Sequence, residues 1–120
     1  MNEQELKLRT KQFALRVIKL VEAMPKTDIG RIIGKQLLRC GTSVGANYRA
    51  VCRARSTADF ISKLGIVIEE ADESCFWLEI IIEAGILKEA LVASLLKEAS
   101  EITAIMVASS NSAQKRKSKI

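Results

Sequence analysis

Apolar residues recur along the chain with the three- and four-residue spacing of amphipathic helices. We predict a first helix over residues 3–24, because Pro25 disfavours helix at the residue before it. Its core positions are Leu6, Phe13, Val17, Leu20, Val21 and Met24. A second helix is expected to begin after an N-cap at Thr27 or Asp28. Its core positions are Ile29, Ile33, Leu37, Cys40, Val44, Tyr48 and Val51.

Two further helices follow the same logic. Ser56 and Asp59 have the spacing of a capping box, which marks the start of the third helix. Its core positions are Phe60, Leu64, Val67, Ala71, Cys75, Leu78 and Ile82. Gly85 is suited to a left-handed C-cap, so this helix is expected to end near Ala84. The fourth helix is predicted over residues 88–108, with a seam of Leu91, Leu95, Ile102, Ile105 and Met106.

The domain organisation follows from these helices and from chain length. Short connections between four helices predict an all-α, antiparallel up-down-up-down four-helix bundle. At 120 residues the chain accommodates one hydrophobic core, and we assign the bundle to residues 1–109. Residues 110–120 are small, polar and basic, and we predict a disordered tail. We identify neither a leader nor a long apolar run, and the three cysteines lack disulfide or metal spacing. We therefore expect a cytoplasmic location.

Several small and polar residues interrupt the apolar face of the second helix. Gly41 and Gly45 lie one turn apart, where each costs about 1 kcal/mol relative to alanine. Close approach of a neighbouring helix would offset that cost, and a kink or a ligand contact is the alternative. Ser43 and Asn47 are expected to form a structural polar network within the bundle, with a functional site as the alternative.

Charged residues are segregated along the chain. Residues 29–58 contain six basic residues and no acidic one, whereas residues 64–87 contain six acidic residues and no basic one. Because an α-helix turns about 100° per residue, several cations of the second helix fall within an arc of about 80°. This basic stripe consists of Arg31, Lys35, Arg39, Arg49 and Arg53. A stripe of this kind favours an anionic partner, and we predict binding of RNA or DNA.

Residue types required for catalysis are scarce. The chain has no histidine, so its cysteines and serines lack an evident activating base. The carboxylates of the third helix also lack the Glu-x-x-His motifs of a di-iron bundle. We therefore predict no enzymatic activity, no catalytic residue, no metal and no cofactor.

The third helix has apolar side chains on its outer side as well as its inner side. Large apolar and aromatic residues grouped on an outer face are typical of an association surface. The predicted homo-oligomer interface contains Ile66, Phe76, Trp77 and Ile80. Alternatively, this helix is the most buried of the four and lies wedged between its neighbours.

The stretch over residues 38–87 contains several recognisable motifs. These are Thr42-Ser43-Val44-Gly45-Ala46-Asn47, Arg53-Ala54-Arg55-Ser56, Asp59-Phe60, Glu69-Glu70-Ala71-Asp72-Glu73 and Phe76-Trp77-Leu78-Glu79. In these motifs the chain resembles the four-helix-bundle protein family encoded in 23S rRNA intervening sequences, which is related to retroelement accessory variability proteins. Where many members carry a glutamate and a glycine after the first motif, this chain has Tyr48-Arg49-Ala50-Val51.

The resemblance implies an up-down bundle that assembles as a ring, with a pentamer as the expected state and no established enzymatic activity. It also implies a positively charged assembly that binds nucleic acid beside a reverse transcriptase. By resemblance, Arg49, Arg53 and Arg55 are candidates for phosphate contact.

Two functional hypotheses compete for the same arginines. In the first, a homo-oligomer binds nucleic acid through repeated basic stripes. In the second, the protein is a structural or protein-binding scaffold, in which the basic helix of one subunit pairs with the acidic helix of the next.

Overall fold

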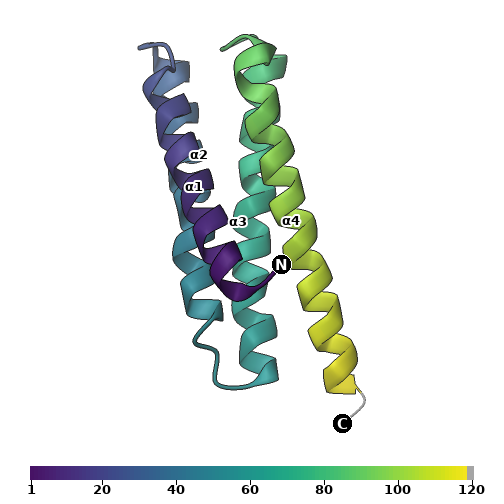
Figure 1. Cartoon of the computed structure of the whole chain (residues 1–120). Helices are drawn as coiled ribbons and strands as arrows, with labels where there is room; N and C mark the ends of the chain where they lie inside the picture. The colour runs from purple at the N-terminus through teal and green to yellow at the C-terminus, as the bar shows by residue number, and fades with distance from the viewer. Residues whose placement is uncertain (119–120) are drawn as a thin grey trace.

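The computed structural model describes residues 1–118 as four α-helices without a strand among them. The helices are α1 (Glu3–Glu22), α2 (Asp28–Val51), α3 (Thr57–Glu83) and α4 (Glu89–Ser118). They run along one long axis in alternating directions, joined by short connections (Figure 1). The molecule measures 53 × 22 × 21 Å. The predicted all-α, up-down-up-down four-helix bundle is therefore confirmed.

Local capping explains where the helices begin and end. The Thr27 hydroxyl accepts a hydrogen bond from the Gly30 amide at 3.0 Å and caps α2. At α3, the Ser56 hydroxyl accepts from the Asp59 amide at 3.0 Å, which is one of the two bonds of a capping box. The Asp59 carboxylate accepts instead from the Arg55 amide, at 3.2 Å. Gly85 has a φ of 67°, the left-handed conformation expected of the residue that terminates α3. Each of these boundaries agrees with the prediction.

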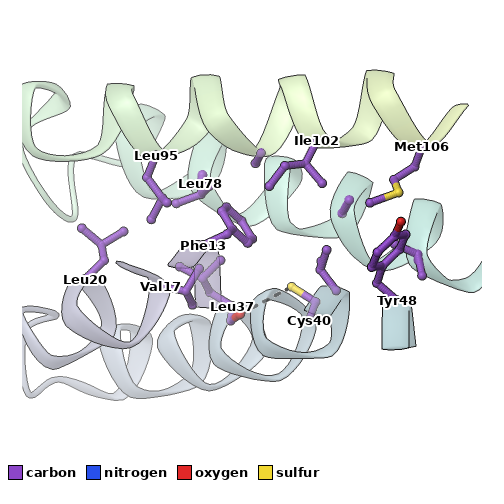
Figure 2. Packing of buried hydrophobic residues seen from close by; sticks show 14 of the residues in the cluster. Phe13, Val17, Leu20, Leu37, Cys40, Tyr48, Leu78, Leu95, Ile102 and Met106 are labelled. Atoms are coloured by element: carbon purple, nitrogen blue, oxygen red, sulfur yellow. Dashed lines mark hydrogen bonds between the residues drawn. The ribbon is translucent and has the colours of Figure 1, made fainter. Parts of the chain in front are cut away.

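The core is a single cluster that receives side chains from all four helices (Figure 2). Phe13, Leu37, Leu78 and Ile102, one from each helix, are buried to 1% exposure or less. The inward residues recur at the predicted helical spacing because each helix presents one apolar face to the axis. Two predicted core residues are instead exposed, Ile29 at 63% and Leu91 at 61%.

Both exceptions lie in the first turn of a helix. There the inward position belongs to the following residue, Gly30 in α2 and Val92 in α4, and both of these are buried. The sequence pattern did not distinguish adjacent apolar positions at a helix end, because the helical phase is defined by fewer turns there.

α4 is longer than the sequence predicted. It continues as a helix through Ser118 instead of ending near Ala108. Ser110 and Ala113 are buried and extend the inward spacing that includes Met106. Small polar residues are common in disordered tails, yet their small size also suits close helix packing. Residues 109–118 are therefore helical, while residues 119–120 of the predicted tail lie outside the described part of the chain.

α1 and α2 approach each other closely at the glycines of α2. A Cβ atom on Gly41 would lie 2.8 Å from both Cγ atoms of Val17. A Cβ atom on Gly45 would lie 3.2 Å from the Thr10 carbonyl oxygen. The glycines thus serve close helix approach rather than a kink. Their low helix propensity is offset by the contact they permit.

Ser43 and Asn47 do not form the expected network. The Ser43 hydroxyl donates to the Arg39 carbonyl at 2.7 Å, and the Asn47 amide donates to the Ser43 carbonyl at 2.9 Å. Both bonds stay within α2, and both side chains are half-buried. Such back-bonding to the preceding turn satisfies short polar side chains on a helix without a partner helix.

α1 and α4 are joined by polar contacts. The Arg9 guanidinium donates two hydrogen bonds to the Glu98 carboxylate, at 2.8 and 2.7 Å. The Arg16 guanidinium donates to the Ser94 hydroxyl at 2.9 Å. The Arg9–Glu98 pair is largely shielded, with side chains 22% and 18% exposed. The hydrogen bond from Arg9 lowers the pKa of Glu98 below its usual value.

Replacing Gly41 with alanine tests the close approach. Overpacking against the stiff, buried Val17 side chain costs about 1–3 kcal/mol, partly offset by the roughly 1 kcal/mol that alanine gains in a helix. The matched control is Gly65→Ala, because a Cβ there meets nothing within 4 Å and should stabilise the protein. Urea denaturation of both variants measures the difference. If Gly41→Ala stabilises the protein as much as Gly65→Ala, the helices are not in tight contact.

Replacing Glu98 with glutamine tests the α1–α4 pair. Since the folded pKa of Glu98 is lowered, its stabilising contribution is present above the unfolded pKa of about 4.3 and is lost as pH falls through the folded pKa. We expect Glu98→Gln to lower the free energy of unfolding at pH 7 by about 1–3 kcal/mol and to flatten its decline between about pH 5 and pH 3. Thermal denaturation across that range measures both effects. Glu101→Gln is the control, because Glu101 is 52% exposed and lies 3.7 Å from Arg9.

Candidate nucleic-acid interface

The basic stripe of α2 is divided in the folded protein. Arg39 turns toward α3, where its guanidinium contacts the Glu70 carboxylate at 3.3 Å and also pairs with Glu73. Glu73 in addition accepts a hydrogen bond from the Trp77 indole N–H at 3.0 Å. Arg39 therefore links α2 to α3 within one chain and is not free to bind an external anion.

Arg31 and Lys35 lie at the other end of α2. The Arg31 guanidinium contacts the Asp28 carboxylate at 2.8 Å and the Lys26 carbonyl at 3.0 Å. The Arg31–Asp28 pair is exposed, so solvent screening makes this ion pair weak. Arg31, Lys35 and Lys26 line a depression of about 280 Å³ at the α1–α2 turn.

Arg49 and Arg53 share a groove with two lysines of α1. The groove encloses about 340 Å³ and is lined by Lys7 and Lys11 from α1 and by Arg49 and Arg53 from α2. The other lining residues are Ala14, Thr42, Gly45 and Ala46. Among the described residues no carboxylate lines it, and neither arginine forms an ion pair. We call this feature the basic groove.

The close approach of α1 and α2 creates the basic groove. Gly45 lies against Thr10, and small side chains at Ala14 and Ala46 keep the floor low. Each helix contributes two cations four residues apart, which therefore lie on one face. Like charges at this spacing repel each other, and a bound anion would relieve that repulsion. The sequence did not indicate Lys7 and Lys11, because their i, i+4 spacing does not reveal which face of α1 meets α2.

Arg55 lies apart from the other candidates. It follows the end of α2 and lines a hollow at the end of the bundle with Tyr48 and Arg116. Its backbone amide donates to the Asp59 carboxylate at 3.2 Å. The structure thus separates Arg55 from Arg49 and Arg53, which the sequence had grouped together.

The outer face of α3 is apolar in part. Ile66 and Phe76 are 45% and 50% exposed, while Ile80 is half-buried. Trp77 is also half-buried and packs against the core, with its ring 5.0 Å from that of Phe76 in an edge-to-face arrangement. The expectation that Trp77 projects away from the core is corrected, because the indole lies over the bundle and bonds to Glu73.

Further exposed apolar residues occur elsewhere. On α1, Leu8 and Leu15 are 57% and 55% exposed, and neither was singled out from the sequence.

Within residues 1–118 no group of acidic, cysteine or histidine side chains is arranged to hold a metal ion. In the same part of the chain, no helix has the length and apolar character needed to cross a membrane.

A family profile described as 23S rRNA-intervening sequence protein matches residues 2–108. The chain belongs to this family. A solved structure similar to this family member is that of a protein of unknown function from the S23 ribosomal protein family of Bacteroides thetaiotaomicron. The two are 32% identical, the match covers 92% of this chain and 99% of the other, and the TM-score is 0.84. A comparison with curated proteins gives no match.

The roles assigned to Arg39 and Arg53 predict different effects on stability. Arg39→Ala removes a partly exposed link between α2 and two carboxylates of α3, and we expect it to lower the free energy of unfolding by about 0.5–1 kcal/mol. Arg53→Ala is expected to change stability by less than about 0.5 kcal/mol, because Arg53 has no ion pair among the described residues. Urea denaturation at low and high salt measures both variants. Equal losses of stability in the two variants would contradict this division of roles.

Proposed function

We propose that this member of the 23S rRNA-intervening sequence protein family is a non-enzymatic, homo-oligomeric protein that binds the phosphate backbone of nucleic acid in the basic groove. The observation that carries this proposal is the convergence of Lys7, Lys11, Arg49 and Arg53 on one groove without a lining carboxylate. Unpaired cations on a preformed surface bind polyanions by releasing condensed counterions.

The composition of the basic groove favours backbone contact over base recognition. Its floor consists of glycine, alanine and threonine, and it contains no aromatic side chain on which a base could stack. The cations extend along two helices, as phosphates do along a strand. Binding is therefore expected to depend strongly on salt and weakly on sequence.

Homo-oligomerisation would strengthen weak binding by each subunit. The exposed side chains of Ile66 and Phe76 support an association surface on α3. Several basic grooves in one assembly would bind a long strand together, so the overall affinity would exceed that of one groove. A pentamer, a reverse transcriptase as a partner and a cytoplasmic location remain predictions from the sequence.

The scaffold function is the second candidate. It is favoured by the Arg39 contacts with Glu70 and Glu73, which illustrate that the basic face of α2 pairs well with the acidic face of α3. In a scaffold, Arg49 and Arg53 would make similar contacts with a neighbouring subunit. In the first function Arg49 and Arg53 are needed to bind phosphates, and in the second they are needed for contact between subunits.

The double variant Arg49→Ala/Arg53→Ala distinguishes them. If the basic groove binds phosphates, we expect RNA affinity to fall by at least about tenfold. The slope of log affinity against log salt should flatten by about 0.7–0.9 for each phosphate that the variant no longer neutralises. Fluorescence anisotropy with a labelled oligoribonucleotide measures affinity, and sedimentation velocity measures assembly. Arg39→Ala is the matched control, since it removes a cation from the same helix that is already paired.

Two outcomes would contradict the binding proposal. One is an absence of salt-dependent RNA or DNA binding by the unmodified protein. The other is dissociation of the oligomer by the double variant, which would support the scaffold instead.

A further inference from the structure

A hollow of about 480 Å³ lies at the end of the bundle where α2 gives way to α3. The beginning of α1 and the end of α4 also contribute to it, through Glu3 and Arg116. This end of the molecule is at the bottom of Figure 1. No lining residue of the hollow also lines the basic groove, so the two are separate features.

The hollow carries a net positive charge. Arg55 and Arg116 line it, against a single carboxylate from Glu3. Neither arginine forms an ion pair within residues 1–118. A guanidinium group presents paired donors that match two oxygens of a phosphate, so two unpaired arginines favour that ligand.

The start of α3 adds backbone donors to the same wall. Ser56 satisfies the amides of Asp59 and Phe60, through its hydroxyl at 3.0 Å and its carbonyl at 2.9 Å. The amides of Thr57 and Ala58 have no hydrogen bond among the described residues. Unpaired amides at the positive end of a helix bind anions.

A buried tyrosine adds a polar side chain to the lining of the hollow. Tyr48 is 7% exposed and lies at one end of the buried cluster (Figure 2). It also lines the hollow. Within residues 1–118 the hydrogen-bond partner of its hydroxyl is the Cys52 thiol, a weakly bonding group. No described side-chain oxygen sealed from solvent lacks a partner, so the Tyr48 hydroxyl is not an orphaned buried group. A polar group placed there is suited to bonding a ligand.

The hollow also has an apolar wall that suits a flat ring. Phe60 is half-buried and lines both the hollow and an adjoining depression that includes Arg116 and Ile105. Val51 closes the inner side. A nucleobase could therefore contact Phe60 while its phosphate meets the arginines.

The hollow adjoins the basic groove. Arg53 lines the groove, while its chain neighbours Cys52 and Ala54 line the hollow. Burial and the neighbouring Glu3 carboxylate together raise the pKa of the Cys52 thiol to about 11, although the charge of Lys7 has a small opposing effect. Because consecutive residues of the chain line the two features, a strand in the groove would lead toward the hollow.

We propose that the hollow binds the terminal phosphate of a nucleic-acid strand whose backbone occupies the basic groove. For a nucleic-acid strand as the ligand, this inference rests on the proposed function. A free mononucleotide has the same phosphate and base. A terminal phosphate monoester carries a charge of about −1.5 to −2 at pH 7, compared with about −1 for an internal phosphate. The two guanidinium groups and the amides at the start of α3 are therefore expected to bind a terminal phosphate more tightly than an internal phosphate.

The test compares short oligoribonucleotides of one sequence that carry a 5′-phosphate, a 3′-phosphate or no terminal phosphate. We expect one phosphorylated form to bind the full chain about tenfold more tightly than the form without a terminal phosphate. Arg55→Ala/Arg116→Ala should abolish this preference, whereas Arg49→Ala/Arg53→Ala should weaken all three forms equally. Both arginines of the hollow are exposed, so their removal should leave the fold intact, and circular dichroism checks this. Glu3→Gln provides a second variant and should increase the preference by removing the opposing charge.

Alkylation of Cys52 reports occupancy of the hollow directly. Adenosine monophosphate should slow the reaction of Cys52 with iodoacetamide several-fold, while Cys75, which does not line the hollow, should react unchanged. Mass spectrometry distinguishes the two sites.

The outcomes separate this proposal from the proposed function. Equal, salt-dependent binding of all three oligoribonucleotides, without protection of Cys52, would overturn the terminal-phosphate site and leave the basic groove supported. Protection of Cys52 by the mononucleotide without binding of any oligoribonucleotide would support a free-nucleotide site and reject the groove. Absence of both effects would overturn both proposals.

Discussion

The contact between α1 and the glycine-bearing face of α2 is the constraint that shapes both the core and the candidate binding surface. Gly41 accommodates the two methyl groups of Val17, and Gly45 lies against the Thr10 backbone. A larger side chain at either position would separate the helices. The same contact that closes this side of the core brings Lys7 and Lys11 beside Arg49 and Arg53. Core packing and the basic groove thus have one physical origin.

The arginines of α2 have different roles despite their similar helical phase. Arg39 faces α3, and its charge is neutralised by Glu70 and Glu73. Arg49 and Arg53 face α1, which contributes lysines instead of carboxylates at that level. A charge pattern on one helix therefore becomes either a structural link or a binding surface, depending on the charges of the helix packed against it.

Family membership is consistent with this fold. The similar solved structure, from the S23 ribosomal protein family, is itself a protein of unknown function. The proposals for nucleic-acid binding accordingly depend on the geometry of this chain. The basic groove and the hollow at the bundle end adjoin each other near Cys52, and together they would provide a path along α1 and α2 with a defined end.

The number of helices, their order, most of their boundaries and most of the core could be predicted from the amino-acid sequence. Such features arise from local capping and from apolar spacing repeated over many turns. The folded chain was needed to show that α4 extends to Ser118, that Arg39 is paired, and that Lys7 and Lys11 join Arg49 and Arg53. Periodicity defines which face of a helix is apolar, whereas the partner of each polar face depends on how separate helices rotate against one another when they pack.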